Sequence, residues 1–84
     1  MAHETRATQL LDFLRREVVI DRRHPLDVDT ALVSSGLVDS LSLIGVLAFV
    51  EDTFGVVIPD EAATAASMNT PRSILSLVQR FERG

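Results

Sequence analysis

The sequence predicts an all-α protein, a small four-helix bundle of three main helices and one short helix, with a long loop between helices one and two. Three segments carry apolar residues at the i, i+3, i+4, i+7 spacing of a helix with one buried face. A threonine followed by a proline at 70–71 is a typical helix start. The extended apolar run 56–59 is short and ends in a proline, which disfavours a lasting strand. The 84 residues suffice for one small domain, 1–84.

The first helix is predicted over about 5–19. Thr5 is expected to cap it, and Phe13, beside the apolar stripe, is expected to help pack a loop. The polar segment 20–25 ends in a proline that stops the helix. The stripe itself consists of Ala7, Leu10, Leu11, Leu14 and Val18.

A long loop is predicted over 26–38, where no apolar period is sustained and turn-forming residues are frequent. A loop of this length needs a reason inside a small domain. We expect its leucines to be pinned to the core while it delivers Gly36 to Ser40 to the next helix. The segment 30–34 would allow a short turn of helix.

The second helix is predicted from Ser40 to about Phe54, with Gly55 ending it. Its core stripe is expected to be Leu43, Leu47, Val50 and Phe54, flanked by Val46 and Ile44. The opposite side, which includes Leu41, Gly45, Ala48 and Asp52, is unusually apolar for a surface. Gly45 costs the helix up to about 1 kcal/mol relative to alanine, which suggests a close approach there. We interpret this side as a docking patch beside Ser40; the alternative is a set of scattered surface apolar residues.

The last third of the chain contains the remaining two helices. Asp60 is expected to cap a short helix over about 61–66. Thr70 and Pro71 begin the final helix, which ends near Glu82 and buries Ile74, Leu77, Val78 and Phe81.

Charge is distributed unevenly along the chain. The net charge is −4, and all eight basic residues are arginines: Arg6, Arg15, Arg16, Arg22, Arg23, Arg72, Arg80 and Arg83. The stretch between Arg23 and Arg72 holds seven acids, Asp27, Asp29, Asp39, Glu51, Asp52, Asp60 and Glu61. An acidic middle argues against nucleic acid as a partner and favours basic enzyme surfaces. The alternative is an acidic face that serves solubility.

Composition excludes several other classes. At 46% hydrophobic the chain can build a core, which disfavours disorder. It has no cysteine, hence no disulfide and no thiolate of its own. His24 has no metal-ligand neighbours, and with His3 as the only other histidine and no cysteine, no metal site is expected. The beginning of the chain lacks the apolar segment of a signal peptide, and the longest apolar run, 43–50, is far below the roughly 20 residues that span a bilayer. We therefore expect a cytoplasmic protein with no membrane partner.

Ser40 is the candidate for covalent modification. Asp39 is a good N-cap residue, which places Ser40 at the first helical position, where free amides and the helix dipole favour an anion. A phosphodiester on its hydroxyl would fit there; the alternative is that Asp39 and Ser40 are only a helix cap. A hydrolase is disfavoured, because the Gly-x-Ser-x-Gly motif is absent and neither histidine is tied to Ser40.

Three segments of the middle of the chain match a known pattern: Gly36-Leu37-Val38-Asp39-Ser40-Leu41, the helix end Phe49-Val50-Glu51-Asp52-Thr53-Phe54-Gly55, and Val57-Ile58-Pro59-Asp60-Glu61. With these segments the chain resembles the acyl carrier protein family. The resemblance covers nearly the whole chain. It implies that a phosphopantetheinyl transferase attaches phosphopantetheine from coenzyme A to Ser40, which Asp39 precedes. It also implies a partner face on the second helix. The residues that we assign to this face are Leu41, Ile44, Gly45, Ala48, Glu51 and Asp52.

The resemblance implies a carrier rather than an enzyme. The thiol of the arm would hold an acyl or aminoacyl group as a thioester and deliver it to partner enzymes. The expected partners are the transferase, a loading ligase or transferase, and a downstream synthase or transferase, and the carrier is expected to be a monomer. Ser42 and Gly45 stand where carriers of fatty acid synthesis commonly have acids. This departure favours polyketide or other specialised biosynthesis.

Two alternatives remain open. One is an aminoacyl or peptidyl carrier of a nonribosomal-peptide-type pathway. Its usual Gly-Gly before the serine region is replaced here by Val38-Asp39, which favours an acyl cargo. The other is a carrier-like interaction module that is never modified.

Overall fold

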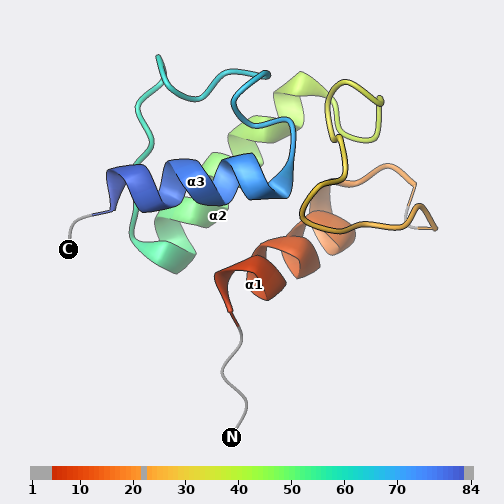
Figure 1. Ribbon diagram of the computed structural model, residues 1–84, viewed down its shortest axis with the longest axis horizontal. Coiled ribbons are helices and arrows are strands. Elements are labelled where there is room, and N and C mark those ends of the chain that lie inside the picture. The colour runs from red at the N-terminus through yellow and green to blue at the C-terminus, as the bar shows by residue number, and fades with distance from the viewer. Residues whose placement is uncertain (1–4, 22, 83–84) are drawn as a thin grey trace, which may run out of the picture.

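Three α-helices surround one apolar core in the computed structural model, which describes residues 5–21 and 23–82. They are α1 (Arg6–Phe13), α2 (Leu43–Phe54) and α3 (Pro71–Phe81), shown in Figure 1. A π-helical turn, Leu14–Val18, continues α1, and a 3-10 turn, Ser40–Ser42, leads into α2. No strand occurs within 5–21 or 23–82. The all-α prediction is therefore confirmed.

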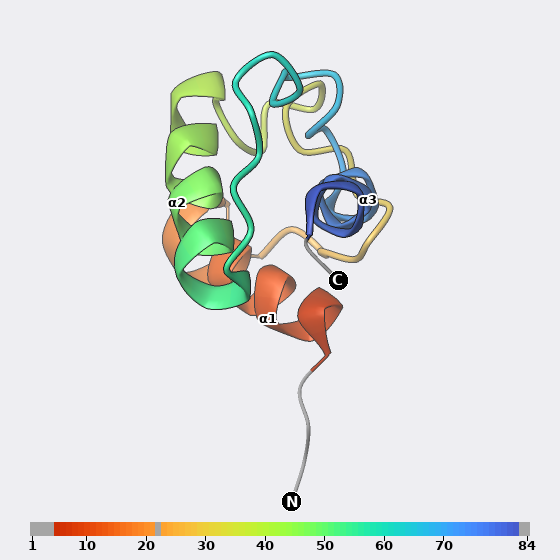
Figure 2. The ribbon, with the colours of Figure 1, turned by 90° about the vertical axis from the view of Figure 1, so that its left-hand side faces the viewer.

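The helices form a bundle with one extended segment inside it. Figure 2 shows α2 and α3 on two sides, α1 below them, and the link 55–59 running between α2 and α3. The core comprises Leu10, Leu14, Val19, Leu32, Leu37, Val38, Leu43, Val46, Val50, Val56, Ile58, Met68, Ile74, Leu77 and Val78. Burying one such side chain fully contributes about 1.5–3 kcal/mol relative to leaving it exposed. Loop leucines are among the core residues, as expected for a loop that is pinned to the bundle.

Local signals locate the helix ends correctly. The Thr5 hydroxyl accepts a hydrogen bond from the Thr8 amide at 3.1 Å and begins α1. Thr70 and Ser73 form a reciprocal capping box, with the proline next to the cap, and begin α3. Gly55 ends α2 in the left-handed region at φ 69°.

The first helical segment ends one residue earlier than predicted. Its last bond joins the Val19 amide to the Leu14 carbonyl at 2.8 Å, and Val19 itself is extended and buried. Phe13 packs against α2, because its ring stacks on Phe49 with centroids 4.3 Å apart. That Phe13 also helps to pack a loop stays a prediction.

The short helix predicted over 61–66 does not form, so Asp60 caps nothing there. The segment makes two turns instead. Hydroxyl groups account for this difference, because the Thr64 amide donates to Ser67 Oγ at 2.9 Å and the Ser67 amide donates to Thr64 Oγ1 at 3.0 Å. Such side-chain bonds compete with the helical backbone pattern. In the long loop, the turn lies at 33–36 rather than at 30–34.

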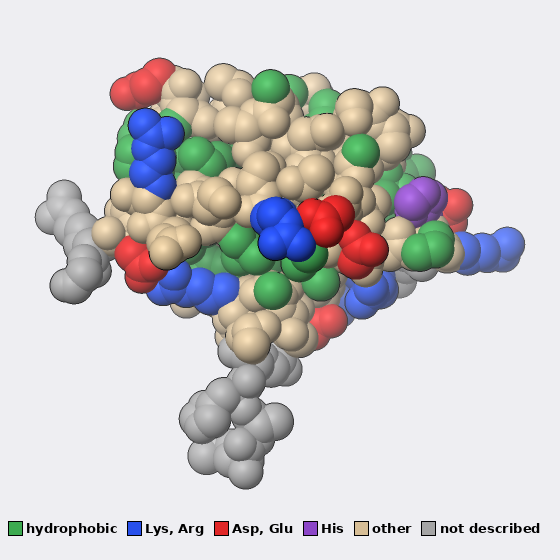
Figure 3. Space-filling model, viewed as in Figure 1, with side chains coloured by type: hydrophobic (Ala, Val, Ile, Leu, Met, Phe, Trp, Pro, Cys, Tyr) green, Lys and Arg blue, Asp and Glu red, His purple; other side chains and the backbone are tan. Residues whose placement is uncertain are grey.

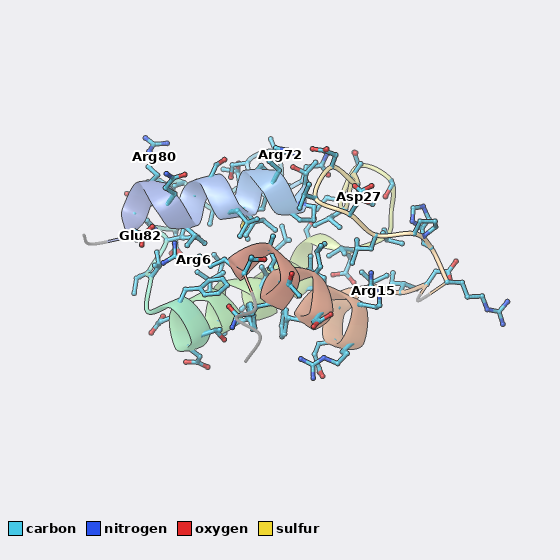
Figure 4. The ribbon with its side chains drawn as sticks, turned by 60° about the horizontal axis from the view of Figure 1, so that its bottom comes forward. Arg6, Arg15, Asp27, Arg72, Arg80 and Glu82 are labelled. Carbon is cyan, nitrogen blue, oxygen red and sulfur yellow. The ribbon has the colours of Figure 1, made fainter. Side chains whose placement is uncertain are left out.

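Two ion pairs tie distant parts of the chain together, and Figure 4 shows Arg6 and Glu82 near one end of α3 and Arg72 near the other. Arg6 contacts Glu82 at 2.7 Å, and Arg72 contacts Asp29 at 2.7 Å. Figure 3 shows basic and acidic side chains side by side on the face of the molecule that Figure 1 also shows. The arginines Arg22 and Arg83, and His3, lie outside the described residues.

Candidate modification site and partner face

Asp39 begins the helical segment that carries Ser40. Its backbone is extended, and its Oδ1 accepts a hydrogen bond from the Ser42 amide at 2.9 Å. Ser40 is the first residue of the 3-10 turn, so the predicted cap and the predicted first position are both confirmed. The sequence did not indicate that the first turn is 3-10 rather than α.

Ser40 is held outward between buried neighbours. Leu37 and Val38 are 6% and 1% exposed, and Leu43, which follows the turn, is 6% exposed. Ser40 itself is exposed, as is Asp39. Anchors on both sides therefore fix the backbone while the serine hydroxyl points away from the core.

All six predicted partner-face residues are exposed, and they lie along α2 and the turn before it. Leu41 and Ile44 are 78% and 66% exposed, although Ile44 was also expected to flank the core stripe. The buried face of α2 is centred on Leu43, Val46 and Val50, while Leu47 and Phe54 are only half-buried. The core stripe is therefore rotated slightly toward Val46.

A groove of about 520 Å³ lies between the end of the first helical segment and α2. It is lined by Phe13, Glu17, Val18, Ser42, Gly45, Ala48, Phe49, Asp52 and Thr53. Two of these residues are acids and none is basic. A Cβ added at Gly45 would meet nothing within 4 Å, so packing within the chain does not require glycine there. The contribution of Glu17 and Phe13 was missed, because it depends on how α1 crosses α2.

A family model described as the phosphopantetheine attachment site matches residues 9–78. The chain belongs to this family. Members of the phosphopantetheine attachment site family are defined by a covalently attached phosphopantetheine group. The matched range includes the 3-10 turn, all of α2 and α3 as far as Val78. The comparison with curated proteins gave no match.

The region around Ser40 fits the phosphodiester of this family's prosthetic group. The Ser40 hydroxyl is exposed and makes no hydrogen bond within the described part of the chain. The first amides of a helix have no intrahelical partner and attract an anion. The negative charge of Asp39 repels such an anion only in part, because its carboxylate accepts a hydrogen bond from the Ser42 amide.

Within residues 5–21 and 23–82, no group of three or more His, Cys, Asp and Glu side chains could hold a metal ion. His24 is exposed, and its Nδ1 lies 2.7 Å from the Pro25 carbonyl oxygen. None of the helices in these residues has both the length and the apolar character needed to cross a bilayer.

Proposed function

We propose that this protein carries an acyl intermediate as a thioester on a phosphopantetheine arm attached to Ser40. The observation that carries the proposal is the position of Ser40 in a chain of this family. It has an exposed hydroxyl in the first turn of a capped helix, fixed by buried neighbours on both sides. The protein itself supplies no catalytic group in this proposal.

Attachment is a transfer from coenzyme A to the Ser40 hydroxyl. Ser40 Oγ forms a P–O bond to the phosphate of phosphopantetheine, the pyrophosphate bond of coenzyme A breaks, and adenosine 3′,5′-bisphosphate leaves. A base of the transferase takes the hydroxyl proton. The role of Asp39 is to hold the turn, because its carboxylate accepts the Ser42 amide. When bound, the group supplies the terminal thiol that holds the cargo.

The partner face receives the enzymes that load and unload the arm. Leu41 and Ile44 supply exposed apolar area near Ser40, while Glu51 and Asp52 supply negative charge further along α2. Apolar anchors give affinity and charges give orientation at such a surface. The partners proposed are a phosphopantetheinyl transferase, a loading ligase or transferase, and a downstream synthase or transferase. The carrier is proposed to act as a monomeric domain in the cytoplasm.

An acyl cargo of polyketide or other specialised biosynthesis is proposed rather than a fatty acid chain. No acid lies between Asp39 and Glu51, and Ser42 and Gly45 line the groove where acids would otherwise stand. A partner that fits this surface must approach α2 closely near Gly45. The cargo is tested by loading the phosphopantetheine-bearing protein with an acyl transferase and, separately, with an amino-acid-activating ligase. Loading by the transferase alone supports an acyl cargo, and loading by the ligase alone supports an aminoacyl cargo.

The attachment is tested by the intact mass of the protein after incubation with coenzyme A and a phosphopantetheinyl transferase of broad specificity. We expect the mass of one arm on the wild type and on Ser42→Ala, and none on Ser40→Ala. Ser42 is a matched control, since it lies two residues away in the same turn. An arm on Ser40→Ala would refute the assignment. No arm on the wild type, with a competent carrier labelled in the same tube, would favour the unmodified interaction module.

A further inference from the structure

The side chain of Asn69 fastens the loop that leads to Ser40. Its Oδ1 accepts hydrogen bonds from the backbone amides of Val33, at 2.8 Å, and Ser34, at 2.9 Å. Its Nδ2 donates to Ser34 Oγ at 3.0 Å. Its backbone carbonyl accepts the Leu32 amide at 2.6 Å. A single residue just before α3 thus bonds to three consecutive loop residues.

Leu32 connects this contact to the modification site. Its carbonyl accepts the Val38 amide at 2.9 Å, and both side chains are buried, at 0% and 1% exposed. Val38 directly precedes Asp39, whose carboxylate caps the turn that carries Ser40. A short series of hydrogen bonds and buried side chains therefore joins Asn69 to the cap.

The contacts between the loop and α3 involve residues that come earlier in the loop. The Arg72 amide donates to the Val28 carbonyl at 2.8 Å, and the Arg72 guanidinium pairs with Asp29. The side chains of this pair are 64% and 68% exposed, and exposed pairs contribute little to stability. These contacts hold the beginning of the loop, whereas Asn69 holds the part that continues into the modification site.

We propose that Asn69 is the positioning residue for the attachment of phosphopantetheine to Ser40, an inference that rests on the proposed function. Without its side chain, the amides of Val33 and Ser34 lose their acceptor, and Val33 is half-buried. An unsatisfied amide favours other loop conformations, in which it reaches water. The Asp39 cap then spends less time in the arrangement that presents Ser40. The partner face on α2 does not change.

The test compares Asn69→Ala, Asn69→Asp and the control Arg72→Ala. Aspartate keeps an acceptor oxygen for both amides, and the Ser34 hydroxyl can donate to its second oxygen. The Asn69→Asp variant should therefore retain the wild-type loop conformation and attachment rate. Amide hydrogen exchange is measured at Val38 and Ser42, which report on the loop and the cap. Val50 and Val78, inside α2 and α3, report on global opening. The kcat and KM of arm attachment are measured on the same samples.

We expect Asn69→Ala to speed exchange at Val38 and Ser42 about tenfold, the effect of losing one or two hydrogen bonds, with Val50 and Val78 unchanged. The kcat of attachment should fall by a similar factor with little change in KM, because docking on α2 is intact. Asn69→Asp and Arg72→Ala should behave like the wild type.

Wild-type attachment kinetics in Asn69→Ala would overturn the inference. An equal rise of exchange at Val50 and Val78 would also overturn it, since this means general destabilisation. A third contrary result would be an Asn69→Asp variant that behaves like Asn69→Ala. If the wild type accepts no arm at all, the proposed function fails instead. The exchange data then still decide whether Asn69 holds the loop.

Discussion

The Asp39 carboxylate lies 2.9 Å from the Ser42 amide, so the residue before Ser40 also begins the helical segment after it. Presentation of the serine hydroxyl and formation of the first turn therefore depend on the same side chain. The two properties should respond together to substitution at this position.

Asp39→Ala should lower the free energy of unfolding by about 1 kcal/mol, the usual cost of losing an N-cap. Asp39→Asn should retain most of that stability, because its amide oxygen can accept the same bond. Urea unfolding measures the difference, and arm attachment should slow in the alanine variant. Equal stability of the alanine variant and the wild type would contradict the role of the cap.

Ile44→Asp should weaken attachment by the transferase about tenfold in kcat/KM, as expected for loss of one apolar anchor. Val57→Asp is the matched control, because Val57 is 65% exposed and Ile44 is 66% exposed, but Val57 lies beyond the far end of α2. Both variants should remain folded by circular dichroism. If Ile44→Asp unfolds the domain, or if Val57→Asp is equally impaired, the partner face is misplaced.

Gly45→Ala should stabilise α2 by up to about 1 kcal/mol, because alanine is the better helix former and its Cβ meets no neighbour. Gly45→Gln should be at least as stable as the wild type, yet it places a side chain in the groove between α1 and α2. We expect the glutamine variant to lose partner activity while the alanine variant largely retains it. Thermal unfolding and transfer assays report the two effects separately, and full activity of Gly45→Gln would show that partners do not enter the groove.

Acid should remove the contribution of the Arg6–Glu82 ion pair. Hydrogen bonds from the Arg6 guanidinium hold the pKa of Glu82 below its usual value. Because the folded pKa is the lower one, the stabilisation is fully present above the unfolded pKa, about 4, and is lost as the pH falls through the folded pKa. Glu82→Gln should therefore lose less stability than the wild type between about pH 5 and pH 3. Urea midpoints measure this, and an equal loss in both proteins would exclude the pair as a cause.

Local features of the sequence were sufficient for most of the helix ends and for the cap that precedes Ser40. The caps at Thr5, Asp39 and Thr70 depend on neighbours within three residues, so spacing alone reveals them. The same local reasoning wrongly predicted a helix over 61–66. There the Thr64 and Ser67 hydroxyls take the place of the backbone hydrogen bonds that a helix would form.

Contacts between distant residues could not be predicted. The Phe13–Phe49 stack and the side-chain bonds from Asn69 to the loop join residues 35 or 36 positions apart in the chain. They depend on the angles at which the helices cross, and no local pattern encodes those angles. The groove beside Gly45 was anticipated only as a place of close approach, without Glu17 on its other wall.

The Arg6–Glu82 pair also determines how the domain can be tethered. The Arg6 guanidinium lies 5.5 Å from the centre of the Phe54 ring, so the pair sits at the last turn of α2. A 12-residue helix is about 18 Å long, and Ser40 precedes its other end. At residues 6 and 82 the chain therefore lies near the end of α2 that is remote from Ser40. A tether attached at either of these positions should leave Ser40 as open to modification as in the free protein.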